Sequence, residues 1–390
     1  MSVLFLFLPN RNAFASINKR IVLAQPTVIL VSYDAKHLLN TFVTKTFPNH
    51  FTLVSALYEE SHGIVANTFF DPIFNDTFYL DAVSKHYLDS KWWNGELVWI
   101  TNQKAFKKSA VVFWPGSEVK IEGQYPTHYL PMIEQDDPPS FLAAYFNEPD
   151  HSGHKLGPNS SEIKSVVRRM DNVTGYLLES LRNRGFLNQV NLIITSDHGM
   201  ADVNNSRLIQ LDHYIPSDWY TLITDPNRAD HASNVFFHIL PKKGKLNDTY
   251  QKRKTVPHLY TYLKEEIPEE FHYRHNRQGW TITKNKLRID SCGNHGYSNQ
   301  FPDMHPFFLA QGPAFKEGFV SEPFENVNIY SLMCHLLGIE PAPNNGSLQA
   351  VQHLLKEHKY NYTVLIKKSE AGNSNASGTG SVRVSAQGSS

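Results

Sequence analysis

The chain has 390 residues, of which 41% are hydrophobic and 19% charged, so it can bury a core large enough for a globular enzyme. Its 37 basic and 37 acidic residues cancel, which argues against a surface built to bind nucleic acid or another polyanion. The two cysteines, Cys292 and Cys334, leave no readable disulfide framework or thiolate zinc site. The 19 histidines make imidazole the better candidate for a metal ligand.

The N-terminal segment and the glycosylation signals bear on the compartment. Residues 1–26 begin with a short apolar run, "SVLFLFLPN", which we interpret as a leader or a degraded signal sequence. Eight Asn-x-Ser/Thr sequons predict a glycosylated, extracellular or cell-surface protein, at Asn75, Asn159, Asn172, Asn204, Asn247, Asn345, Asn361 and Asn375. No run approaches the roughly 18 apolar residues of a membrane span, so no transmembrane helix is predicted in this chain.

Three continuous apolar runs, at 27–33, 139–146 and 190–196, are typical of strands buried on both faces of a parallel sheet. Between the second and third, apolar residues recur at helical spacing from Ile163 to Leu181. This order predicts an α/β fold. We expect a single catalytic domain at 27–357 and an extension at 358–390. A composition rich in Gly, Ser, Ala and Asn predicts disorder from about residue 369.

Each of the three apolar runs ends near a carboxylate, namely Asp34, Asp150 and Asp197. Ligands of α/β sheets bind beyond the carboxyl ends of the strands, so we expect these side chains to meet in one crevice. Three imidazoles lie on comparable loops, namely His154, His198 and His295. Mixed nitrogen and oxygen ligands of this kind suit zinc, and two groups of three suit two zinc ions.

A hydroxyl nucleophile is supplied by the stretch "TKTFPNHFTLV". Pro48 is typical of the first turn of a helix, so the pattern predicts that Thr46 lies at a helix N-terminus. Free N–H groups and the helix dipole at that end favour an anion such as phosphate. Thr46 is therefore a candidate nucleophile, and a simple N-cap is the alternative interpretation of this residue.

Taken together, the motifs resemble those of the ectonucleotide pyrophosphatase/phosphodiesterase family, within the alkaline-phosphatase superfamily. The resemblance rests on "TKTFPNHFTLV", "ALYEESHGIVAN", "FWPGSEV", "EPDHSGHKLGP", "TSDHGM", "GNHGY" and "APNNGSL", in the family's order from about Thr27 to Leu355. It implies an alkaline-phosphatase-like, mostly parallel sheet flanked by helices on both faces. It also implies zinc-dependent hydrolysis of phosphodiester or pyrophosphate bonds of extracellular nucleotides through a threonyl-phosphate intermediate.

The resemblance also assigns individual roles. It implies that one zinc is held by Asp34, Thr46, Asp197 and His198, with Thr46 as the nucleophile, and the other by Asp150, His154 and His295. Asn67 is implied to hold a phosphate oxygen together with the backbone N–H of the nucleophile. Phe47 and Tyr145 are implied to contact the nucleotide base. The expected partner is therefore a small nucleotide or phosphodiester.

Three departures from the family pattern suggest internal deletions. Asp34 stands only 12 residues before Thr46, where the family has a further helix and strand. Met132 occupies the place of a family tyrosine, and a shorter gap falls near Gln278. Two alternatives therefore stay open. The chain is a choline or lysophospholipid phosphodiesterase of the same family, or it is a catalytically impaired, truncated surface glycoprotein.

Overall fold

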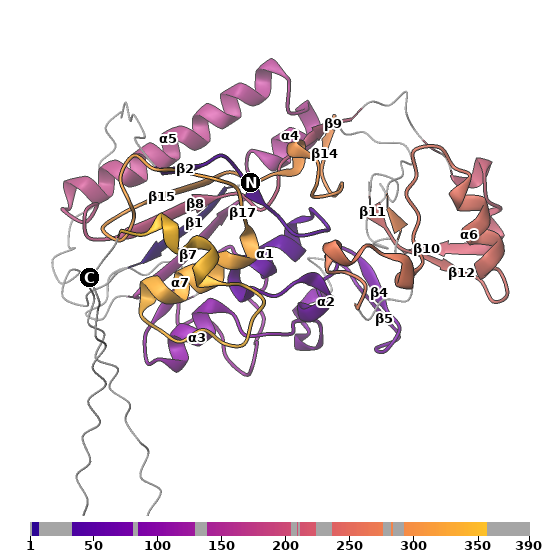
Figure 1. The fold of residues 1–390 in the computed structure, drawn as a ribbon, viewed down its shortest axis with the longest axis horizontal. Helices are drawn as coiled ribbons and strands as arrows, with labels where there is room; N and C mark the ends of the chain where they lie inside the picture. The colour runs from indigo at the N-terminus through magenta and orange to yellow at the C-terminus, as the bar shows by residue number, and fades with distance from the viewer. Residues whose placement is uncertain are drawn as a thin grey trace, which may run out of the picture. The chain divides into compact units, whose positions relative to one another are not determined.

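The largest element of the computed structural model is a seven-stranded sheet (Figure 1). The structure describes residues 2–7, 33–80, 85–128, 139–203, 209, 211–223, 236–275, 282–283 and 292–356. In spatial order the strands are β16 (Val320–Ser321), β2 (Tyr33–Ala35), β15 (Phe308–Gln311), β8 (Asn191–Thr195), β1 (Ser2–Phe7), β7 (Phe141–Phe146) and β6 (Ser109–Val112).

Most strands of this sheet share one direction. The pairs β16–β2 and β6–β7 are parallel, whereas β1 and β15 are antiparallel to both of their neighbours. The other five strands therefore all run the same way, and their carboxyl ends lie at one edge of the sheet. The expected α/β fold with a mostly parallel sheet is confirmed by this arrangement.

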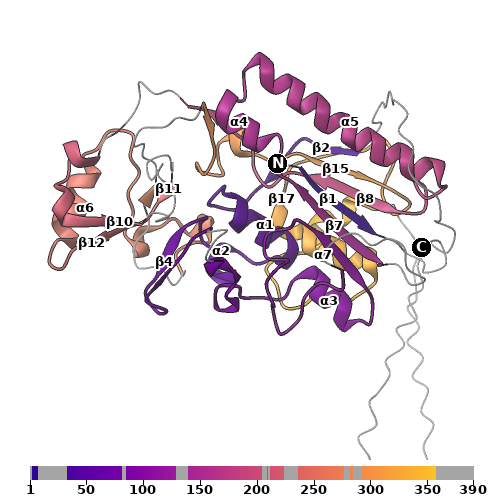
Figure 2. The same ribbon diagram turned by 180° about the vertical axis from the view of Figure 1, so that it is seen from behind.

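Helices cover both faces of the sheet. Figure 1 shows α5 (Ser161–Asn183) on one side and α1 (Thr46–Ser55), α3 (Val98–Lys104) and α7 (Ile329–Leu337) on the other, and Figure 2 shows the same layers from behind. Successive side chains of a strand point to opposite faces. In β7, Phe141 and Ala143 therefore belong to the core under α1, whereas Ala144 belongs to the core under α5.

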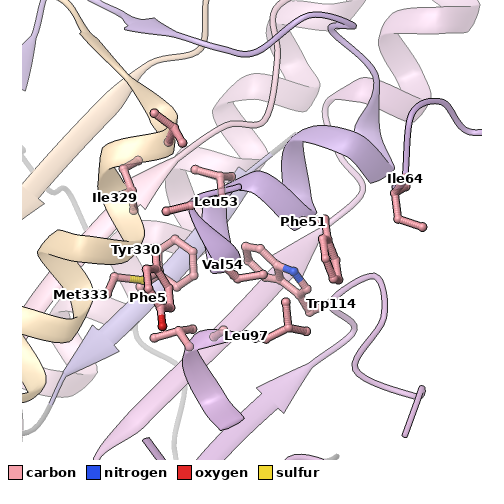
Figure 3. Close-up of a cluster of buried hydrophobic side chains, with 14 of the residues drawn as sticks. Phe5, Phe51, Leu53, Val54, Ile64, Leu97, Trp114, Ile329, Tyr330 and Met333 are labelled. Carbon is pink, nitrogen blue, oxygen red and sulfur yellow. The ribbon is translucent and has the colours of Figure 1, made fainter. Parts of the chain in front are cut away.

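The larger core joins α1 and α7 to the sheet (Figure 3). The ring of Phe5 in β1 lies 5.1 Å from that of Trp114 and 6.1 Å from that of Phe141, measured between centroids. Leu53 of α1 and Met333 of α7 belong to the same core. Burying each such side chain contributes about 1.5–3 kcal/mol, so this layer holds α1, and with it Thr46, against the sheet.

Several predicted elements are confirmed by the structure. The runs at 139–146 and 190–196 form β7 and β8, and the periodic segment forms α5, whose first turn is capped by the Ser160 side chain. The run at 27–33 meets the described residues only at Tyr33, where β2 begins. Residues 2–7 of the predicted leader form β1, between β7 and β8. The leader assignment and the boundaries of the predicted catalytic domain stay predictions.

The remaining elements are short. The other helices are α2 (Glu59–His62), α4 (Asp150–Leu156), α6 (Leu246–Lys254) and α8 (Leu348–Val351). Five two-stranded sheets pair β3 (Leu38–Leu39) with β17 (Phe324–Glu325), β4 (Phe69–Asp71) with β5 (Asp76–Phe78), β9 (Ala201–Asp202) with β14 (Gly293–Asn294), β10 (Tyr220–Leu222) with β12 (Ile239–Pro241), and β11 (Phe236–Phe237) with β13 (Ile282–Thr283). Among the described helices, none has the length and apolar character needed to cross a bilayer. Residues 357–390 lie outside the described residues.

Candidate active site

Thr46 is the first residue of α1, as the Pro48 pattern predicted. The N-cap is Lys45, whose backbone is extended at φ −108° and ψ 155°, so the alternative interpretation of Thr46 as the N-cap is wrong. Thr46 is buried, and its Oγ1 lies 3.4 Å from Nε2 of His198. Its hydroxyl therefore faces the residues that follow β8.

The end of β8 places a carboxylate and an imidazole side by side. Asp197 is fully buried, and its Oδ2 lies 3.1 Å from Nε2 of His198. On its other side, the same oxygen lies 3.4 Å from Nδ1 of His50 in α1. These contacts bring the carboxyl end of β8 to the N-terminal turn of α1.

The second group of residues begins where β7 ends. Asp150 and His154 lie one turn apart on α4, with 3.4 Å between Oδ2 and Nε2. Nε2 of His295 lies 3.6 Å from Oδ1 of Asp150, and Nε2 of His198 lies 3.9 Å from it. One ligand atom from each of Asp150, His154 and His295 lies within 4.8 Å of the others. Asp150 and His198 thereby join the two predicted groups into one site.

Backbone carbonyls orient all three imidazoles. Nδ1 of His154 bonds to the carbonyl of Gly293, Nδ1 of His198 to that of Gly199 and Nδ1 of His295 to that of Thr44, at 2.9, 2.8 and 2.8 Å. A carbonyl oxygen can only accept, so each Nδ1 carries the hydrogen and each neutral ring presents the lone pair of Nε2. This arrangement is typical of histidines that bind a metal ion.

The donor set fits a cation. Three Nε2 atoms face carboxylate oxygens at 3.1–3.6 Å, and when the rings are neutral this arrangement is repulsive unless a positive charge lies between nitrogen and oxygen. Oδ1 of Asp150 is buried and has no hydrogen-bond partner among the described residues. Imidazole nitrogens together with carboxylate oxygens are ligands that zinc accepts. Asp150, His154, His198, His295 and Asp197 could thus hold metal.

The charges of the site keep its carboxylates ionised. Burial alone would raise the pKa of Asp150, but His154, His295 and His198 outweigh burial when their rings are protonated and hold this pKa below its ordinary value. The pKa of Asp197 is also lowered, because His198 and His50 outweigh the effect of burial. Burial, with the neighbouring charges of His198 and Lys45, lowers the pKa of His295. A neutral His295 is a competent ligand at neutral pH.

Asn67 and the two predicted aromatic residues lie around Thr46. Oδ1 of Asn67 accepts a 3.0 Å hydrogen bond from the backbone N–H of Phe47, which fixes the orientation of the amide. Tyr145 meets the His50 ring edge-on, with 4.5 Å between centroids, and the charges of Asp197 and Asp150 add to burial in raising its pKa. The ring of Phe47 lies 6.1 Å from that of Trp93, measured between centroids. Both aromatic residues are half-buried, so each retains an accessible part.

Two predicted positions are not described in the same detail. Asp34 lies in β2, where its backbone is paired with Leu309 and Val320, but its side chain lies outside the described residues. Its role as a ligand stays a prediction. Met132 and Gln278, which mark two of the predicted deletions, also lie outside the described residues.

Two residues of the site, His50 and Lys45, were not predicted from the sequence. His50 is fully buried, and its Nδ1 contacts the Thr46 carbonyl at 2.8 Å as well as Asp197. Lys45 is buried and close enough to His295 to lower its pKa. A signal was present, because Lys45 directly precedes Thr46 and His50 follows it by one helical turn. Buried charged residues are rare outside functional sites.

Comparison with known proteins places the chain in a family. The model of the type I phosphodiesterase/nucleotide pyrophosphatase family matches residues 31–133 and 126–298. Human ectonucleotide pyrophosphatase/phosphodiesterase family member 5 is 42% identical over 348 residues, which cover 82% of this chain and 71% of the relative. Human bis(5'-adenosyl)-triphosphatase ENPP4 is 39% identical over 357 residues, which cover 82% of this chain and 74% of that relative.

Solved structures agree with the sequence relatives. Murine family member 5 superposes with a TM-score of 0.76 at 40% identity, covering 83% of this chain and 92% of that one. An inactive variant of the same murine protein, in complex with AMP, superposes with a TM-score of 0.77 over the same shares. Members of the type I phosphodiesterase/nucleotide pyrophosphatase family are metal-dependent hydrolases with an alkaline-phosphatase-like fold. The matched family model, the relatives and the solved structures show that the chain belongs to this family.

Proposed function

We propose that the chain is a two-zinc hydrolase that cleaves phosphodiester or pyrophosphate bonds of extracellular nucleotides through a threonyl-phosphate intermediate. The observation that carries this proposal is the convergence of Thr46 with three Nε2 lone pairs and two buried carboxylates. A site that merely stabilised the fold would have no need to direct a hydroxyl at a helix N-terminus into this cluster.

The residues divide into two ligand groups in this proposal. One zinc would be held by Asp34, Thr46, Asp197 and His198, and the other by Asp150, His154 and His295. When bound, such ions lower the pKa of a coordinated hydroxyl or water and polarise phosphoryl oxygens. The ionised carboxylates and the neutral His295 described above are the protonation states that this binding requires.

The chain's own groups would carry out a double displacement. The Thr46 oxygen attacks phosphorus, the phosphorus–oxygen bond to the leaving group breaks, and a nucleotidyl ester forms on Thr46. Water then cleaves this ester and restores the hydroxyl. The backbone N–H of Thr46 and the Asn67 amide would hold the phosphate oxygens, and such a donor is typically worth about 3 kcal/mol.

The substrate is proposed from the aromatic residues and from the relatives. Phe47 and Tyr145 border Thr46 and would contact the base of a nucleotide. A murine relative binds AMP, and another relative is named for cleaving a bis(5'-adenosyl) triphosphate. These observations favour a nucleotide over the choline or lysophospholipid esters cleaved by the alternative class of family member.

An extracellular or cell-surface location is proposed from the sequons and from a relative that is named an ectonucleotide pyrophosphatase/phosphodiesterase. Five sequon asparagines lie among the described residues and all five are exposed, as a glycan requires, namely Asn75, Asn159, Asn172, Asn247 and Asn345. We propose that the chain is a glycoprotein on this basis.

The test is hydrolysis of the nitrophenyl ester of thymidine monophosphate by the purified chain. We expect turnover that is lost with a chelator and regained with zinc, and loss of at least about a thousandfold in kcat for Thr46→Ala. Undiminished turnover by Thr46→Ala contradicts the threonyl mechanism. A lysophospholipid assayed in parallel separates the substrate classes. No activity and no bound zinc in the unmodified chain would favour the impaired glycoprotein instead.

A further inference from the structure

A loop of five residues, 41–45, joins the two halves of the site. Lys45, the last residue of the loop, directly precedes Thr46. The carbonyl of Thr44 accepts the 2.8 Å hydrogen bond from Nδ1 of His295. The Thr44 hydroxyl donates to the carbonyl of Tyr297 at 2.9 Å and accepts from the N–H of Gly296 at 2.9 Å. The shape of this loop therefore determines the positions of both the Thr46 hydroxyl and the His295 imidazole.

Asn49 contacts this loop along most of its length. Its side chain is fully buried, and Nδ2 donates to the carbonyls of Val43 at 2.9 Å and Lys45 at 3.2 Å. Its Oδ1 accepts from both the N–H and the hydroxyl of Thr41, each at 3.1 Å, and from Nδ2 of Asn326 at 3.0 Å. Both amide hydrogens and the carbonyl oxygen are thus used, and four of these five bonds go to the loop.

The direction of the loop carbonyls explains why these bonds bear on His295. Extended backbone at a residue turns its carbonyl away from the preceding one, and Lys45 has extended backbone, so the carbonyls of Thr44 and Lys45 point to opposite sides. Asn49 holds the carbonyls of Val43 and Lys45 on its own side. The Thr44 carbonyl between them is therefore turned the other way, where it meets Nδ1 of His295.

We propose that Asn49 is a positioning residue that holds the loop 41–45 so that Thr46 and His295 keep their relative places. Asn49 touches neither metal nor substrate in this assignment, and it acts through two backbone carbonyls. The inference rests on the proposed function, because it assigns a structural cause to the spacing between the nucleophile and a ligand of the second metal ion.

The test compares Asn49→Asp with Asn102→Asp. The Asp variant keeps the size and an acceptor oxygen of Asn49 but loses both N–H donors. Asn102 is a matched control, because it is also fully buried and its Nδ2 donates to Lys108, Ser109 and Ser140. Ser140 precedes the N-terminal end of β7, whereas the site lies beyond its carboxyl end. Readouts are kcat, KM, zinc affinity by competition with a chromophoric chelator, and unfolding by urea.

For Asn49→Asp we expect kcat and the affinity for the second zinc to fall by about 10–100-fold, with KM nearly unchanged. For Asn102→Asp we expect kcat and zinc affinity within about twofold of the unmodified chain, although its stability also falls. If both variants behave alike while the unmodified chain is active, the assignment of Asn49 is overturned and the proposed function stands. If the unmodified chain neither turns over the ester nor binds zinc, the proposed function itself fails.

If Asn49→Asp does not fold, a second pair of variants tests whether the loop 41–45 positions the site. Thr44→Val keeps the shape of the side chain but removes its bonds to Gly296 and Tyr297, and we expect about tenfold weaker binding of the second zinc. Its control is Thr101→Val, which removes a buried hydroxyl bonded to Tyr330 at 2.8 Å on α7. Equal zinc affinity in these two variants would overturn the role of the loop.

Discussion

His50 shows how a residue that is not a ligand can control one. Its Nδ1 donates to the Thr46 carbonyl at 2.8 Å and lies 3.4 Å from Oδ2 of Asp197, so His50 connects the nucleophile's backbone with a carboxylate of the site. The ring is fully buried against Tyr145 and Trp114. Partners of this kind fix the orientation of a metal ligand.

Two substitutions of His50 separate hydrogen bonding from packing. We expect His50→Leu to lower kcat by about 10–100-fold, because Asp197 loses the imidazole that helps to stabilise its charge. His50→Asn places an amide N–H near the position of Nδ1, so it should retain most of the activity that His50→Leu loses. Steady-state kinetics with the nitrophenyl ester measure both. Equal losses in the two variants would show that the ring acts through packing alone.

At the scale of elements, α1 and α2 enclose a second polar cluster that takes no part in the proposed chemistry. Glu59 is fully buried, and its Oε1 lies 2.5 Å from the hydroxyl of Thr41. Burial raises the pKa of Glu59 well above its ordinary value, and burial lowers the pKa of His62 to about 3. The folded protein therefore holds both groups uncharged over a wide range of pH.

Glu59→Gln should change how stability depends on pH. Above the unfolded pKa of about 4.3 and below the raised folded pKa, the folded chain holds one proton more than the unfolded chain. The free energy of unfolding of the unmodified chain therefore falls by up to about 1.4 kcal/mol per pH unit in this window. Gln carries no such proton. Urea unfolding from pH 4.5 to 7.5 should show the variant gaining stability relative to the unmodified chain as pH rises.

The comparison of the two chains isolates Glu59. His62 contributes a slope of the opposite sign between pH of about 3 and its unfolded pKa of about 6.5, but it does so in both chains and cancels from the difference. A stability difference that stays constant with pH would contradict the assignment of an uncharged, buried Glu59.

Local patterns predicted the elements whose apolar pattern is complete within one segment of the chain. The apolar runs of β7 and β8 and the periodicity of α5 are complete within each segment, so each element was predictable from its own residues. The antiparallel β1 and β15 depend on which distant strands they pair with, and periodicity carries no such information. Likewise, His50 is buried against Trp114 and Tyr145, which are distant in sequence, and the role of Asn49 depends on the bend of the loop 41–45, so both roles emerged only from the fold.

At the scale of the whole molecule, the candidate site depends on every layer of the fold. Its described residues come from α1, the end of β8, α4 and the segment that contains β14, which span the chain from Thr46 to His295. The motifs predicted the identity of these residues, because each motif is short and rich in Asp or His. Their distances could not be predicted, since these depend on how α1 and α4 pack around the ends of β7 and β8.

This dispersal predicts that zinc binding and folding are linked. Ligands from separate elements meet only in the folded chain, so each bound zinc should raise the free energy of unfolding by about 2.7 kcal/mol when its free concentration is 100 times the dissociation constant of its site. Urea unfolding with chelator and with added zinc measures this gain. Asp150→Asn with His154→Ala should remove the share of the second ion, about half of this gain, and Mg²⁺ should substitute poorly because imidazole nitrogens suit zinc better. Equal stability with and without zinc would mean that the cluster binds no metal in the folded state, since a bound ion cannot leave the unfolding equilibrium unchanged.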